Sequence, residues 1–152
     1  MEFQFEVLRV TRKNVLNSIK NLTIDQLNTI PEGFNNNIMW NVVHLIATQQ
    51  LLVYGLSGQA FKVSKDLINA YRKGTAPSET VTEEQFDEYK KLFFSTIDQM
   101  EEDYNNGLFG DNFKTYPTSF GITLEKLEDA ITFNNAHEAM HLGNILSMKK
   151  LV

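Results

Sequence analysis

Apolar residues recur at steps of three and four along four segments of this chain, and such steps place them on one face of a helix. The first segment runs from about residue 2 to 22, and Arg12 is the one charged gap in its apolar stripe. The second runs from about Asn37 to Leu56, where glycines end it. Both stripes predict helices of about 20 residues that bury one face.

The third and fourth segments also carry signals for where a helix begins. Thr82 is followed three residues later by Gln85, the spacing of a capping box, which predicts that the third helix begins there. Thr123 precedes the last apolar stripe and has Glu125 close behind it, so we expect Thr123 to be the N-cap of the fourth helix.

Two long connections join these helices, residues 59–80 and residues 105–121. The first includes a possible short helix, SKDLINAYRK, and the second is rich in glycine and aromatic residues. Four helices with long crossover connections predict an all-α four-helix bundle, with residues 1–152 as one domain.

Charge and composition narrow the possible partners. The net charge is −5, so we expect neither nucleic acid nor an anionic membrane surface as a partner. No segment reaches the roughly 18 apolar residues of a membrane span, and the N-terminal sequence lacks the pattern of a signal peptide, which together predict a cytoplasmic protein. There is no cysteine, so any thiol chemistry requires a small-molecule thiol.

The chain has three histidines, and all three fall on bundle-facing lines of the predicted helices. His137 and His141 are four residues apart, which stacks them on one helix face. His44 lies on the same line as Trp40 and Ala47 of the second helix. An isolated pair at this spacing is usually not a metal site, and a lone histidine on an apolar face is usually a core residue. Together they predict one divalent metal ion, zinc, nickel or similar, with open positions for a substrate.

The sequence from His137 to His141 also matches HExxH, the signature of zinc proteases in which the glutamate is the general base. No histidine, aspartate or glutamate follows His141, so the downstream third ligand of such proteases is missing. We therefore interpret Glu138 as a surface residue that could alternatively support the metal ligands.

Three asparagines lie three residues from a histidine on the same predicted helix, and their roles stay open. They either orient a ligand or bound substrate, or are solvated. They are Asn41, Asn134 and Asn144.

Two motifs, WNVVHL in the second helix and HEAMHLGNIL in the fourth, resemble those of the DinB-like (damage-inducible, YfiT-like) family. The resemblance spans nearly the whole chain in the same order. It implies His44, His137 and His141 as the metal ligands, a bundle with a long crossover and a homodimer. It also implies relatives that are bacillithiol- or mycothiol-dependent transferases and isomerases.

The leading functional hypothesis is a metal-dependent enzyme with activity like a low-molecular-weight-thiol S-transferase on a small-molecule substrate. The thiol would be a cosubstrate, and the catalytic residues are left unassigned. The alternatives are a metal-dependent hydrolase and a non-catalytic metal-binding stress protein. An open pocket beside the histidines favours an enzyme, whereas a closed, dry site favours a structural role.

Overall fold

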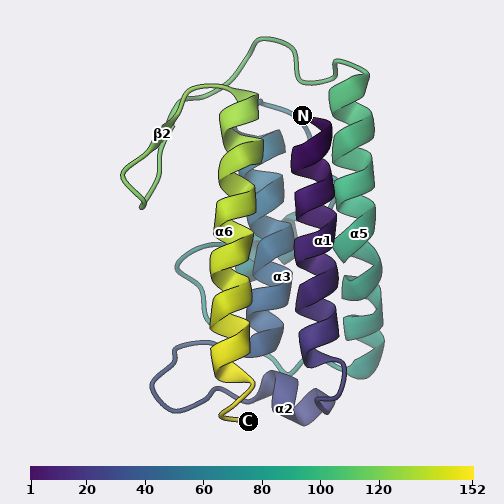
Figure 1. The fold of residues 1–152 in the computed structure, drawn as a ribbon, viewed down its shortest axis with the longest axis vertical. Coiled ribbons are helices and arrows are strands. Elements are labelled where there is room, and N and C mark those ends of the chain that lie inside the picture. The colour runs from purple at the N-terminus through teal and green to yellow at the C-terminus, as the bar shows by residue number, and fades with distance from the viewer.

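The structure, a computed structural model, describes all 152 residues. Its four long helices lie side by side along the long axis of the molecule (Figure 1). They are α1 (Glu2–Ile19), α3 (Ile38–Gln49), α5 (Glu83–Asn105) and α6 (Leu127–Met148). The prediction of an all-α four-helix bundle is confirmed.

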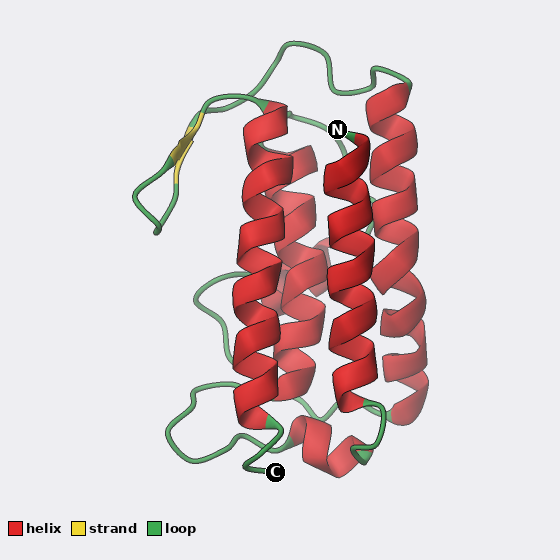
Figure 2. Cartoon of the chain, in the orientation of Figure 1, coloured by secondary structure: helices red, strands yellow, loops and turns green.

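Short elements fill the connections. They are α2 (Ile24–Asn28), the π-helical turn η1 (Gln50–Gly55) that continues α3, α4 (Lys65–Tyr71), β1 (Tyr116–Pro117) and β2 (Thr123–Leu124). The two strands pair antiparallel as a small hairpin that projects beside α6 (Figure 2). None of the helices has both the length and the apolar composition needed to cross a membrane.

Polar residues cap the starts of α3 and α5, and the second of these caps was predicted from the sequence. The Asn37 side chain accepts a hydrogen bond of 2.7 Å from the backbone N–H of Trp40, which caps the first turn of α3. Thr82 and Gln85 form both hydrogen bonds of the predicted capping box at the start of α5. These caps use only local contacts, which explains why local sequence identifies them.

The prediction that Thr123 caps the last helix is wrong. Thr123 lies in β2, where it pairs with Pro117, and α6 begins four residues later, at Leu127. The carboxylate of Asp129 accepts the backbone N–H groups of Glu125 and Lys126 instead. Pairing with β1 holds Thr123 in an extended strand, so it is too far from the first turn to cap it.

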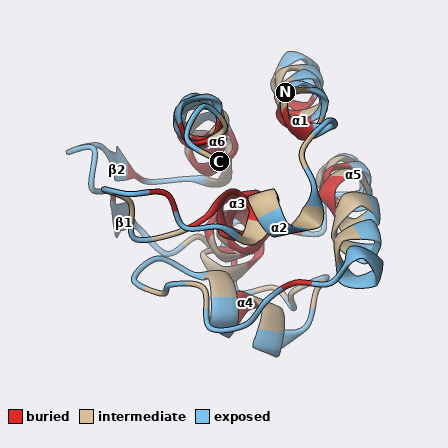
Figure 3. Cartoon of the chain, turned by 90° about the horizontal axis from the view of Figure 1, so that it is seen from below, coloured by how far each residue is buried: buried red, intermediate tan, exposed pale blue.

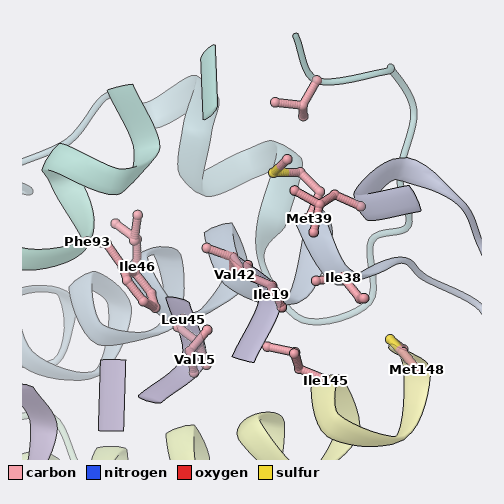
Figure 4. Close-up of a cluster of buried hydrophobic side chains, with 12 residues drawn as sticks. Val15, Ile19, Ile38, Met39, Val42, Leu45, Ile46, Phe93, Ile145 and Met148 are labelled. Carbon is pink, nitrogen blue, oxygen red and sulfur yellow. The ribbon is translucent and has the colours of Figure 1, made fainter. Parts of the chain in front are cut away.

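Helix α3 is the central element of the bundle. Seen from one end, it lies between α4 on one side and α1 and α6 on the other (Figure 3). Every residue of α3 except Thr48 is buried. Its apolar side chains meet those of α1, α5 and α6 in the main core cluster (Figure 4). This packing fixes the spacing of α3 and α6, which carry the three histidines.

Candidate metal centre

The three histidines come together at one point inside the bundle. His44 on α3 and His137 and His141 on α6 each offer a ring nitrogen, and these nitrogens lie within 4.8 Å of one another. The His44 ring centroid is 5.3 Å from that of His137 and 4.8 Å from that of His141. All three side chains are buried. The structure thus joins residues that are far apart in the sequence, as their helix faces predicted.

Hydrogen bonds orient two of the three rings. His44 Nδ1 lies 2.6 Å from the backbone carbonyl of Tyr71 in α4, and a carbonyl only accepts, so Nδ1 donates. His141 Nδ1 donates to Asn41 Oδ1 at 2.7 Å in the same way. In each neutral ring the proton is therefore on Nδ1, which leaves an unprotonated Nε2. An outer partner that fixes the tautomer is typical of metal-ligating histidines.

The third ring completes the group from the next turn of α6. His137 Nε2 lies 3.1 Å from His141 Nε2, and His137 Nδ1 is buried without a hydrogen-bond partner. Two imidazole nitrogens this close are favourable only with a proton or a cation between them, because their lone pairs otherwise repel. Three ring nitrogens that converge at one point are the kind of ligand set that holds a divalent ion.

The pocket keeps the imidazoles neutral. Burial lowers the pKa of His44, although the hydrogen bond to the Tyr71 carbonyl partly opposes the shift. Burial, together with the nearby rings of His141 and His44, lowers the pKa of His137 to about 3. Burial and His44 lower the pKa of His141 to about 4. At neutral pH all three rings are thus in the form that binds metal ions.

A cavity of about 640 Å³ opens directly onto the three histidines. Much of its wall is apolar or aromatic, including Trp40, Leu52, Phe61, Phe120, Phe133 and Met140. The Trp40 ring stacks on the His44 ring at 4.4 Å, and the Thr48 hydroxyl lies 3.2 Å from His44 Nε2. A space of this volume accommodates a small organic molecule beside the histidines.

The comparison with protein families agrees with this geometry. The model of the DinB superfamily matches residues 8–145. The chain belongs to the DinB superfamily. The matched region includes all three histidines and the four long helices, apart from the ends of α1 and α6. The comparison with curated proteins gives no significant match.

Glu138 of this DinB protein is not on the surface, so that interpretation of the sequence is wrong. It is fully buried and faces Arg12 of α1, which donates to its carboxylate from Nε at 3.0 Å and from Nη2 at 2.7 Å. Because adjacent residues on a helix differ by about 100° in direction, Glu138 points toward α1 while His137 faces the cavity. The charged gap at Arg12 in the first apolar stripe was the sequence signal of this pair.

Arg12 uses all of its donors inside the bundle. Besides the two contacts to Glu138, it donates to the Phe93 carbonyl, to Thr96 Oγ1 and to Gln49 Oε1. The carboxylate of Glu138 thus already has its counter-ion, and it does not line the cavity. This geometry argues against the zinc-protease interpretation, in which that glutamate would face the substrate.

The asparagines divide into three different roles. Asn41 orients His141, as described above, and Asn134 donates to Glu138 Oε1 at 3.0 Å. Asn144 is exposed and makes no side-chain hydrogen bond. Sequence reasoning missed the Tyr71 carbonyl, because a backbone group on a crossover helix leaves no side-chain pattern.

Proposed function

We propose that this protein is an enzyme that binds one divalent metal ion through His44, His137 and His141 and transfers a low-molecular-weight thiol to an electrophilic substrate. The observation that carries the proposal is the convergence of three neutral imidazoles on the wall of a 640 Å³ cavity. A structural metal site would instead have four protein ligands and be closed to other molecules.

The chemistry that this site can support follows from its three neutral nitrogen ligands. When bound, a divalent ion with three neutral ligands would keep its positive charge and lower the pKa of a coordinated thiol or water. Two of the three rings are held in place by the chain: the Tyr71 carbonyl orients His44, and Asn41 orients His141. The Thr48 hydroxyl lines the same cavity, 3.2 Å from His44 Nε2.

One feature of the protein bears on the source of the sulfur, and another favours thiol transfer over hydrolysis. The protein has no cysteine, so the sulfur nucleophile must come from a cosubstrate. No acidic residue lines the cavity, and Glu138 is paired with Arg12, which leaves hydrolysis without a carboxylate base. In the proposed reaction the thiol loses its proton to solvent, its sulfur bonds to the electrophilic carbon, and the leaving group departs with the electron pair of its bond.

Metal binding is tested on protein purified without a histidine tag. Elemental analysis should find one equivalent of a divalent metal per chain in the wild type. His141→Ala should lose it, because two imidazoles from different helices hold an ion much less firmly than three. Asn144→Ala, on the same helix but exposed, is the matched control and should keep the metal. Equal metal content in wild type and His141→Ala would contradict the proposed site.

The reaction is tested by incubating the metal-loaded protein with a model electrophile and bacillithiol, mycothiol, glutathione or no thiol. We expect conjugation above background with at least one thiol, and its loss in His141→Ala. Hydrolysis of ester or amide substrates without any thiol would instead establish the hydrolase alternative. Metal binding with neither activity would favour a non-catalytic metal-binding protein.

A further inference from the structure

The charged residues that line the cavity are both lysines. Lys73 follows α4, and Lys114 precedes the β1–β2 hairpin, so each crossover connection supplies one. No aspartate or glutamate lines this cavity, although the chain as a whole has a net charge of −5. The charge of the cavity is therefore opposite to that of the protein.

Neither lysine has a counter-ion in the protein. The lysines in ion pairs are Lys62, Lys90 and Lys91. Lys73 and Lys114 are exposed and form no ion pair or side-chain hydrogen bond. Their ammonium groups are thus available to a bound anion without breaking an existing contact.

The backbone ties both lysines to the histidine cluster. Lys73 comes two residues after Tyr71, whose carbonyl holds His44. The backbone N–H of Lys114 donates to the Leu56 carbonyl at 2.7 Å, which attaches this connection to the end of η1. The backbone segments that carry the two lysines therefore have a defined place beside the cavity that holds the histidines.

A second cavity of about 470 Å³ provides an internal contrast. Trp40 lines both cavities, and the lining of the second includes Asp66 and Glu79 but no lysine or arginine. An anion entering the protein near Trp40 would thus be repelled from the second cavity and attracted to the first.

We propose that the natural substrate or thiol cosubstrate is an anion, carrying a carboxylate or phosphate group that binds between Lys73 and Lys114. Its apolar part packs against the aromatic wall, and its reactive group faces the three histidines. This inference deepens the proposed function and names the charge class of its ligand. The lysines act in binding, and because both are exposed, their contribution is moderate and decreases with salt.

The test uses metal-free protein and probes with one aromatic body: 1-naphthylacetate, 1-naphthyl phosphate and the neutral 1-naphthylacetamide. Trp40 is the only tryptophan and lines both cavities, so its single indole N–H resonance in an NMR titration reports binding at either, and the lysine variants below assign the effect to the first cavity. At low salt we expect at least one anion to bind about 10-fold more tightly than the amide. The tighter anion identifies carboxylate or phosphate as the preferred group.

Substitutions assign the effect to the two lysines. Lys73→Gln and Lys114→Gln should each weaken binding of the preferred anion about 2–5-fold, and the double variant about 10-fold, with little effect on the amide. Lys13→Gln removes the same charge from the exposed face of α1 and should change nothing. Equal affinity for anions and amide, no binding of any probe, or an equal effect of Lys13→Gln would overturn the inference.

The outcome is independent of the proposed enzyme activity, because no metal is present in this titration. If the titration shows selectivity for anions but elemental analysis finds no metal in the wild type, this inference stands and the proposed function fails. If the protein transfers thiols with a bound metal but binds anions and the amide equally, the proposed function stands and this inference fails.

Discussion

Two polar clusters lie within the bundle, and two adjacent residues of α6, Glu138 and His137, belong to different ones. Glu138 joins Arg12 in a cluster where every donor of the guanidinium has an acceptor. His137 joins the other two histidines at the wall of a cavity, and its Nδ1 has no partner. The first cluster is closed and its two charges are paired, whereas the second is open and incomplete.

The difference separates a structural from a functional use of buried polar groups. A buried charge that is fully paired fixes how helices pack, because leaving one partner alone is strongly unfavourable. Neutral ring nitrogens that are buried beside a cavity are stabilised most by a metal ion or ligand that the chain itself does not supply. The contrast explains why the HExxH pattern misleads here: its glutamate belongs to the closed cluster and its histidines to the open one.

Among single substitutions, the largest expected effect comes from breaking the closed cluster. Glu138→Gln leaves the Arg12 charge buried without its counter-ion, so we expect a loss of about 3–5 kcal/mol in the free energy of unfolding. Urea unfolding of metal-free protein measures it, with Glu125→Gln, an exposed residue of the same type, as the control. A loss below about 1 kcal/mol would mean that the pair does not organise the core.

The open cluster should make stability depend on pH. The folded-state pKa values of His137 and His141, about 3 and about 4, lie below the ordinary value of 6.5, so protonation favours the unfolded chain. Metal-free protein should therefore keep its full stability above about pH 6.5 and lose roughly 1.4 kcal/mol per pH unit for each such histidine as the pH falls toward 4.

Thermal unfolding across this pH range checks the dependence. The double variant His137→Ala/His141→Ala should show a much flatter profile between pH 6.5 and pH 4. An unchanged profile in this variant would place the responsible groups outside the histidine cluster.

A smaller effect should follow from loosening one histidine. Asn41→Ala removes the acceptor that orients His141, and we expect metal affinity to fall about 10–100-fold while the fold is kept. Competition with a coloured chelator measures the affinity, and Asn144→Ala serves as the control. Unchanged affinity in Asn41→Ala would show that this hydrogen bond does not hold the ring in its metal-binding orientation.

The smallest effect should come from the edge of the closed cluster. Asn134→Leu removes one hydrogen bond to Glu138, but it also removes a buried carbonyl oxygen that has no partner. Because the two changes oppose each other, we expect a loss of about 1 kcal/mol or less in urea unfolding. A loss as large as that of Glu138→Gln would show that Asn134 is essential to the cluster.

The sequence by itself determined the features that depend on short-range patterns. Steps of three and four residues placed the four long helices, and the local capping box placed the start of α5. The same periodicity put His44, His137 and His141 on inward faces, which was enough to predict that they meet. An apolar stripe has one buried side, so a polar residue on it requires a partner in the interior.

Only the tertiary structure decided which partner each polar group found. The burial of Glu138 depends on Arg12 of another helix, and the loss of Thr123 as a cap depends on its pairing with β1 in the hairpin. The Tyr71 carbonyl and Lys73 reach the site through the course of a crossover connection. Such contacts are set by how helices and loops pack together in three dimensions, and spacing along one helix carries no information about that packing.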